Sequence, residues 1–269
     1  MKLLYADEVN VERDSTDFFI YGGVIIPDDK AAELSKRVDT IRAGCGYRPE
    51  DLLKFNTRER AAHITADKHK EAKKLVMEAA ANCGVKLLTS FISHKIALSP
   101  TEARRREINR VCYHFNCHLT RTNEHGLVLI DTFQDQQLTK ILQEKFSVGL
   151  RGMPYTQAYR LDRILGFHLS SIGSSNFCSI VDIAMGALRY AINSRGVPES
   201  IPVIKVLLDQ LSPLFIRRTH DNKIDGISLF FSPKVIKASI YLEEYLKLVD
   251  FFKQFGLDPI EVPTNTRTY

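Results

Sequence analysis

The feature that most constrains the fold is a pair of apolar runs near the N-terminus. Residues 3–8 read Leu-Leu-Tyr-Ala-Asp-Glu, and residues 18–26 read Phe-Phe-Ile-Tyr-Gly-Gly-Val-Ile-Ile. Runs of this kind are typical of buried β-strands, and their closeness predicts an antiparallel hairpin. The first run ends in two acids, which are costly at the end of a buried strand unless they are paired, hydrogen-bonded or bound to a cation. We therefore expect Asp7 to be paired with a basic side chain, hydrogen-bonded or bound to a cation.

Beyond the hairpin, strand-like and helix-like segments alternate up to about residue 195. Alternation of this kind predicts an α/β fold. Capping and apolar patterns predict helices at 30–42, from Asn56 or Thr57 to 81, and at 99–122, 135–146 and 177–192, with strands at 52–55, 85–93, 127–131 and 160–172. We expect residues 1–195 to form one domain. We expect residues 196–269 to form a C-terminal α/β extension packed on its core, with a strand at 226–231 and a helix at 233–255.

Composition narrows the function classes only a little. The formal net charge of +5 permits a polyanionic partner such as nucleic acid without requiring one. The chain has no run of about 18 apolar residues, so we expect no membrane span. The five cysteines are an odd number within helix- or strand-like segments, and the chain shows no N-terminal signal. These features favour a reduced, cytoplasmic setting.

Three aspartates stand where burial is expected. Asp7 ends the first strand, Asp131 ends the apolar run 127–130, and Asp182 lies within a helix that is apolar nearly all round. Divalent cations such as Mg²⁺ or Mn²⁺ offset the cost of burying carboxylates, and such a donor set suits two-metal phosphodiester hydrolysis. Glu8 faces away from Asp7 in a regular strand, so it is a weaker metal ligand that reaches the site only if the strand bends.

Each acid also has an ordinary structural explanation. Asp7 could pair with Lys54 or an arginine, Asp131 could cap a turn before Thr132, and Asp182 could accept a hydrogen bond from Ser179. Taken singly, each acid is explained as well in this way as by a metal ion, because ion pairs also occur in protein cores. Their joint occurrence favours a shared site.

Several of these segments resemble the domain-of-unknown-function 3800 family. The segments are Leu-Tyr-Ala-Asp-Glu at 4–8, Phe-Ile-Tyr-Gly-Gly-Val at 19–24 and Ser-Ile-Val-Asp-Ile-Ala at 179–184, and the resemblance covers roughly residues 1–195. It implies a ribonuclease H-like mixed sheet flanked by helices, a metal-dependent nuclease site and a lysine, here Lys54, close to the acids. The chain departs from the family pattern beside the acids, with Val9-Asn10 for Ser-Gly, and with Ser179 and Val181 for Gln and Ala.

Two histidine patterns are weaker candidates. His168 precedes the Asp182 helix and could shuttle a proton to a leaving group, although a structural strand histidine is at least as good an explanation. The Cys112-x-His114-x-x-Cys117-His118 pattern suggests zinc, but residues two apart on a helix point in different directions, so one tetrahedral ion cannot use all four.

The leading hypothesis is a metal-dependent nuclease acting on DNA or RNA. Asp7, Asp131 and Asp182 would hold Mg²⁺ or Mn²⁺, with Glu8 assisting and Lys54 contacting phosphate. The alternatives are a degenerate, non-catalytic binding module in a defence or mobile-element system, and a nucleotide phosphohydrolase. The apolar stripe of the last helix, which includes Tyr241, Tyr245 and Phe252, is first of all core-facing, and it also suggests a homodimer.

Overall fold

The computed structural model describes residues 1–12, 17–97, 99–131, 138–150 and 159–266. Within these ranges the strands are β1 (Lys2–Val9), β2 (Phe18–Pro27), β3 (Lys86–Ser93), β4 (Gly126–Asp131), β5 (Ile164–Ser170) and β6 (Leu229–Ser232). The helices are α1 (Asp28–Gly44), α2 (Ala66–Asn82), α3 (Pro100–Thr122), α4 (Leu138–Ser147), α5 (Asn176–Asn193), α6 (Ile201–Leu211) and α7 (Ser239–Gln254).

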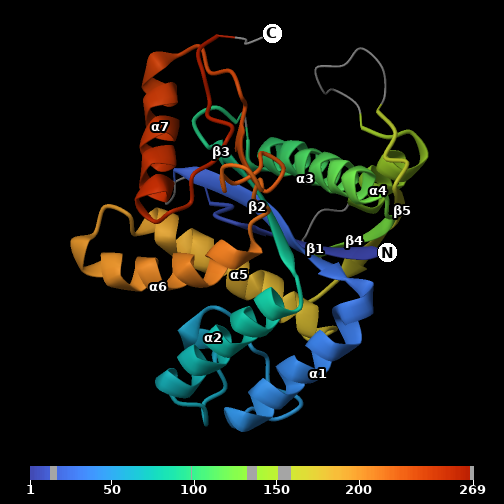
Figure 1. Ribbon diagram of the computed structural model, residues 1–269, viewed down its shortest axis with the longest axis vertical. Coiled ribbons are helices and arrows are strands. Elements are labelled where there is room, and N and C mark those ends of the chain that lie inside the picture. The colour runs from blue at the N-terminus through green and yellow to red at the C-terminus, as the bar shows by residue number, and fades with distance from the viewer. Residues whose placement is uncertain (13–16, 98, 132–137, 151–158, 267–269) are drawn as a thin grey trace.

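The strands form a six-stranded mixed sheet in the order β5-β4-β1-β2-β3-β6 (Figure 1). β2 runs antiparallel to both β1 and β3, which confirms the N-terminal hairpin. The pairs β1–β4, β4–β5 and β3–β6 are parallel. This mixed sheet flanked by helices confirms the predicted α/β fold class.

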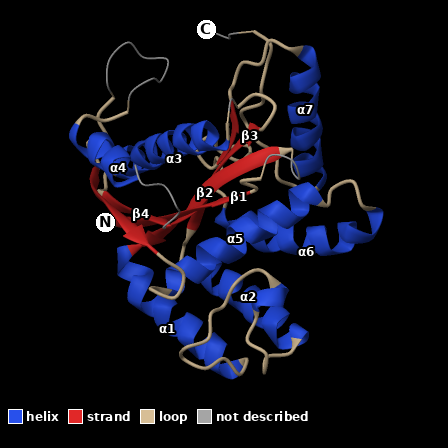
Figure 2. Ribbon diagram, turned by 180° about the vertical axis from the view of Figure 1, so that it is seen from behind, coloured by secondary structure: helices blue, strands red, loops and turns tan. Residues whose placement is uncertain are grey.

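Helices cover both faces of the sheet and give it two hydrophobic layers (Figure 2). On β1, Leu4 and Ala6 pack toward α3, whereas Tyr5 packs toward α5. This two-residue alternation assigns each β1 side chain to one face of the sheet. Asp7 therefore shares the α5 face with Tyr5, and Glu8 shares the α3 face with Ala6.

The helix that carries Asp182 is almost entirely buried. α5 begins after Ser175, whose side chain accepts a hydrogen bond from the backbone N–H of Phe177, and it packs against β1, β2, α2 and α6. Its all-round apolar character follows from this position between the sheet and other helices. A carboxylate on α5 is therefore held close to the sheet.

Two predicted elements between β2 and β3 are wrong. Residues 52–55 are not a strand, because the backbone N–H of Phe55 donates to Asp182 and its carbonyl accepts from Lys73, so neither group pairs with a neighbouring strand. The long helix expected after Asn56 is interrupted: Asn56 caps only a 3₁₀ turn, Thr57–Glu59, and α2 begins after a second cap, Thr65. The remaining predicted helices and strands of the described ranges are present, and residues 132–137, where one helix was expected to begin, lie outside them.

The C-terminal segment adds β6 to the edge of the main sheet and lays α7 against the same core as α5. The domain boundary at residue 195 stays a prediction.

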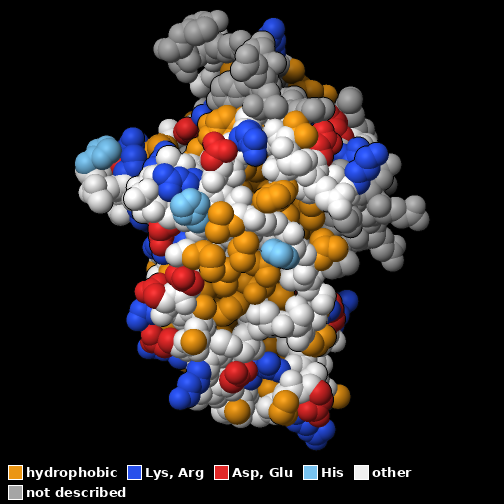
Figure 3. Space-filling view, turned by 90° about the vertical axis from the view of Figure 1, so that its right-hand side faces the viewer, with side chains coloured by type: hydrophobic (Ala, Val, Ile, Leu, Met, Phe, Trp, Pro, Cys, Tyr) orange, Lys and Arg blue, Asp and Glu red, His pale blue; other side chains and the backbone are white. Residues whose placement is uncertain are grey.

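Tyr245, Leu248, Val249 and Phe252 of α7 are buried, so the apolar stripe of this helix is core-facing and offers no support for the expected homodimer. On the described surface, exposed hydrophobic side chains lie on α4 and β5 (Figure 3), at Phe146, Leu165 and Leu169, and on α6, at Val203 and Val206.

No helix in the described part of the chain is both long enough and apolar enough to cross a membrane.

Candidate functional site

The sheet register brings Asp7 and Asp131 together. β1 and β4 are parallel neighbours whose last paired residues are Ala6 and Ile130, so Asp7 and Asp131 follow in register at the carboxyl ends of both strands. Both residues lie on the α5 face by the two-residue alternation of their strands. The same edge of the sheet also carries Ser170, which pairs with Asp131 across β4 and β5.

Asp182 reaches the same place from α5. A cavity of about 100 Å³ is lined by all three aspartates, together with Lys54, Ser170, Cys178, Ala6, Ile172 and Val181. Five separate segments of the chain therefore converge on one small cavity. The structure brings together Asp7, Asp131, Asp182 and Lys54, four of the six residues proposed from the sequence.

The environment of Asp7 disfavours its charge. Burial raises the pKa of Asp7 to about 7; a hydrogen bond from the backbone N–H of Glu8 at 2.7 Å opposes this rise, and the nearby carboxylates of Asp131 and Asp182 add to it. A side chain normally ionised at neutral pH is thus only partly ionised here. A cation in the cavity would offset both causes.

The carboxylate of Asp182 is stabilised by a backbone N–H group and by a nearby lysine. Its Oδ2 accepts a hydrogen bond of 2.5 Å from the N–H of Phe55. Burial raises the pKa of Asp182, and the Phe55 hydrogen bond and the Lys54 ammonium oppose that rise. Lys54 itself lies 2.7 Å from Glu59, and this hydrogen bond raises the pKa of Lys54. The lysine expected near the acids is therefore present and cationic.

Glu8 lies outside the cavity. Its carboxylate forms a bidentate ion pair with Arg104 of α3, with Nε and Nη2 each 2.6 Å from a carboxylate oxygen. Burial raises the pKa of Glu8, and Arg104 opposes that rise. This geometry agrees with the expectation that Glu8 faces away from Asp7, and its role as an assisting ligand stays a prediction.

His168 also lies apart from the aspartates. It is exposed on β5 and lines a separate depression with Phe146 and Leu165. Its proposed part in proton transfer stays a prediction. His114 is buried against the ring of Phe230, at 4.9 Å between ring centroids, and burial lowers its pKa to about 3. A neutral histidine packed on an aromatic ring is typical of a structural core position.

The three aspartates do not form a ready-made metal site. Among the described residues, no three His, Cys, Asp or Glu side chains stand close enough together to hold an ion as they are. The chemistry of the donors nevertheless fits a hard cation: three carboxylates face one cavity, and the buried Asp7 carries a strongly raised pKa. Binding would require the carboxylate oxygens to draw together.

Three neighbours of the site were missed from the sequence. Ser170 and Cys178 line the cavity, and Arg104 binds Glu8. Ser170 was detectable only from the pairing of β4 with β5. Cys178 stands four residues before Asp182 on α5, so helical spacing alone places it on the same face. Arg104 belongs to a run of three arginines in which nothing in the sequence distinguishes the one that pairs.

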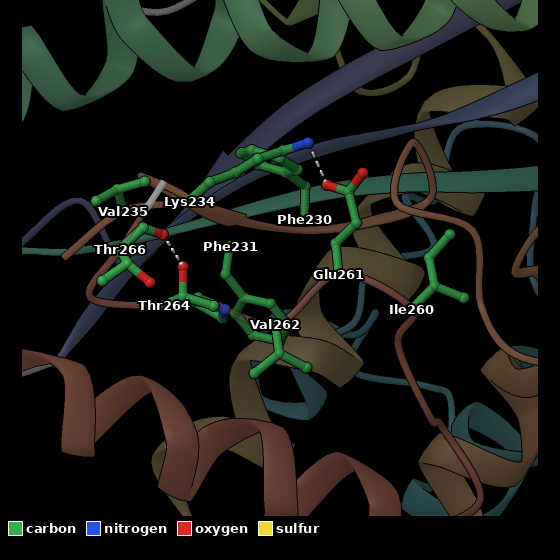
Figure 4. A pocket seen from close by; sticks show the side chains of 10 residues that line it. Phe230, Phe231, Lys234, Val235, Ile260, Glu261, Val262, Thr264 and Thr266 are labelled. Carbon is green, nitrogen blue, oxygen red and sulfur yellow. Dashed lines mark hydrogen bonds and ion pairs between the residues drawn. The ribbon is translucent and has the colours of Figure 1, made fainter. Parts of the chain in front are cut away.

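A second cavity, of about 350 Å³, contains none of the three aspartates (Figure 4). It lies between β6 and the C-terminal segment, beside Phe230 and Thr264. Its charged groups pair with each other, since Lys234 lies 2.7 Å from Glu261. It therefore offers no carboxylate set comparable to that around Asp7.

No protein-family model matches the chain, and no curated protein matches it. The resemblance to the domain-of-unknown-function 3800 family accordingly stays an expectation. Solved structures similar to this chain include ribonuclease HII in a PCNA complex from Archaeoglobus fulgidus, at 11% identity and TM-score 0.39, covering 100% of this chain and 96% of that one.

Two further ribonucleases H are similar to the same extent. Ribonuclease H2 from Pyrococcus horikoshii OT3 has 11% identity and TM-score 0.36, covering 98% of this chain and 92% of that one. Bst-RNase HIII in complex with Mn²⁺ has 10% identity and TM-score 0.36, covering 80% of this chain and 64% of that one. Likenesses of this size transfer neither an activity nor a metal to this chain.

Proposed function

We propose that this protein is a metal-dependent nuclease that hydrolyses phosphodiester bonds at the cavity around Asp7. One observation carries the proposal: three aspartates from β1, β4 and α5 line one cavity, where burial and mutual repulsion raise the pKa of Asp7 to about 7. Clustered acids that disfavour each other's charge are more often found at functional sites than in ordinary cores.

Each residue has a part in this proposal. Asp7, Asp131 and Asp182 would hold Mg²⁺ or Mn²⁺, which when bound supplies charge compensation for the phosphate and lowers the pKa of a water molecule. Lys54, at the wall of the cavity, would contact a phosphate oxygen and stabilise its developing charge. Ser170 would donate a hydrogen bond at the same edge. The Glu8–Arg104 pair would fix the end of β1.

A second candidate function is that of a degenerate, non-catalytic module that binds nucleic acid. One observation favours it: as they stand, no three suitable side chains of the described residues form a metal site. A nucleotide phosphohydrolase remains the third alternative from the sequence. It differs from a nuclease in accepting mononucleotides rather than polymers.

The test is cleavage of labelled DNA and RNA with Mn²⁺ or Mg²⁺ by the parent and by Asp7→Asn. We expect Asp7→Asn to lose cleavage while keeping its circular dichroism spectrum. Asp250→Asn is the matched control, because Asp250 is 71% exposed on α7, and it should cleave as the parent does. Equal cleavage by Asp7→Asn and the parent would make the assignment wrong. Turnover of mononucleotides but not polymers would favour the phosphohydrolase.

A further inference from the structure

A larger groove adjoins the carboxylate cavity. It has a volume of about 700 Å³ and is bounded by residues 55–58, α2, α5 and α6. These three helices contact one another and lie together on one side of the sheet (Figure 1). None of the three aspartates lines the groove, so it is a separate feature of the surface.

The charged residues that line the groove are all basic. They are Arg58, Lys70, Lys73 and Arg189, and no acid lines the groove with them. Within the described part of the chain, neither Lys73 nor Arg189 forms an ion pair with a carboxylate. Lys73 donates to the carbonyl of Phe55 at 2.8 Å, and burial lowers its pKa to about 8. Cations without acidic partners complement an anionic ligand.

The lining that α6 supplies to the groove is mostly apolar. Val203 and Val206 are 49% and 54% exposed, and Pro202 and Leu207 line the groove with them, as does the polar Gln210. The groove therefore has two chemical characters. Val203 and Val206 supply exposed apolar surface, and Lys73 and Arg189 supply positive charge. A nucleotide has the same two, since its base has apolar faces and its phosphate is anionic.

The groove and the carboxylate cavity lie next to each other at residues 54 and 55. Phe55 lines the groove, its N–H binds Asp182, and the preceding residue Lys54 lines the cavity. Arg189 lines the groove, and its charge lowers the pKa of Asp182 in the cavity. A ligand in the groove would therefore lie close to the aspartates.

We propose that this groove binds a single-stranded segment of nucleic acid next to the cleaved bond, with phosphates on Lys73 and Arg189 and a base against Val203 and Val206. The inference deepens the proposed function and relies on it for the chemistry at the cavity. A single strand fits better than a duplex, because duplex bases are stacked inside the helix and cannot reach an apolar wall.

The experiment measures binding without turnover, by fluorescence anisotropy of a labelled single strand of ~10 nucleotides in EDTA. Arg189→Gln is compared with Arg37→Gln, which removes the same charge from an exposed position on α1. Val206→Asp is compared with Val197→Asp, because Val197 is 45% exposed and lies outside the groove. Circular dichroism checks the fold of every variant, and an unlabelled duplex of equal sequence is the competitor.

We expect Arg189→Gln and Val206→Asp each to weaken binding about tenfold, and the two controls to change it less than twofold. Arg189→Gln should also reduce the salt dependence of log K by about 0.7, the value of one phosphate contact to a single strand. Equal binding by the groove variants and their controls would overturn the inference, as would absent binding by the parent or equal competition by the duplex.

The groove and the nuclease assignment fail in different ways. Asp7→Asn should keep single-strand binding in EDTA, because Asp7 does not line the groove. Loss of binding in the groove variants without cleavage by the parent would support the groove and contradict the nuclease. Cleavage by the parent with unchanged binding in the groove variants would support the nuclease and overturn the groove.

Discussion

At the scale of single residues, the fold disfavours the ionised form of Asp7. Its pKa is raised to about 7 by burial first and by Asp131 and Asp182 after that. Unfolding releases this carboxylate to water, where its pKa is 3.8. The folded state therefore binds more protons than the unfolded state between these values, and the contribution of Asp7 to stability falls as the pH rises from about 4 to about 7.

Asp7→Asn should accordingly stabilise the metal-free protein at high pH. In EDTA at pH 8 we expect the free energy of unfolding to rise by about 2–4 kcal/mol, since a full pKa shift of this size is worth about 4 kcal/mol and partial exposure reduces it. The gain should shrink as the pH falls and approach zero below about pH 4, where the parent carboxyl becomes protonated in the unfolded state as well. Urea denaturation across this pH range is the measurement, and a loss of stability at pH 8 would contradict the account.

The three aspartates were predictable as residues because each interrupts or ends an apolar run. The residues that contact these aspartates or line the cavity with them were harder to predict. Lys54 was only one of several possible partners of Asp7 until the family resemblance placed a lysine near the acids, and Arg104 could not be separated from Arg105 and Arg106 by sequence alone. The partner of a long side chain depends on the distance between the elements that carry the two residues, and a single sequence does not give this distance.

At the scale of elements, the contact between the Phe55 segment and α5 positions the site. Gly186 stands one turn after Asp182, and a Cβ at this position would overlap the ring of Phe55. The missing side chain lets Phe55 approach α5 closely enough for its N–H to bind Asp182. Phe55 is also covered by Lys73, whose Nζ lies 4.4 Å from the ring centroid.

Gly186→Ala should therefore displace Phe55 and disturb Asp182. We expect a loss of about 1–3 kcal/mol in the free energy of unfolding, as for other overpacked positions, with reduced cleavage. Gly44→Ala is the matched control: it is also a helical glycine, and a Cβ there meets nothing within 4 Å. It should leave stability unchanged or raise it by up to about 1 kcal/mol. Equal stabilities of the two variants in urea denaturation would contradict this role of Gly186.

The Phe55 segment also shows the limit of prediction at this scale. Its apolar residues suggested a strand, but its backbone groups bond to Asp182 and Lys73 from distant parts of the chain. α3, by contrast, was predicted closely, because its Ser99 cap, the first-turn Pro100 and the left-handed Asn123 at its end are local signals. Local signals were sufficient wherever tertiary contacts did not override them.

At the scale of the whole molecule, the sheet order assembles the site. The parallel neighbours β1 and β4 place Asp7 and Asp131 at one end of the sheet. The packing of α5 on β1 brings Asp182 to the same place, although Asp182 follows Asp131 by 51 positions in the chain. The alternation of strands and helices predicted the fold class. It did not predict that β6 of the C-terminal segment joins the same sheet, because strand pairing across such a separation leaves no local signal.

Manganese binding tests this convergence most directly. Isothermal titration calorimetry would compare the parent with Asp131→Asn and Asp182→Asn, with Asp250→Asn as the exposed control. We predict saturable binding heat for the parent and the control, and an affinity at least ~10-fold weaker in each site variant, because the ion would be held by carboxylates from separate elements. No binding heat in the parent, or equal affinity in all four proteins, would contradict the proposed three-aspartate metal site.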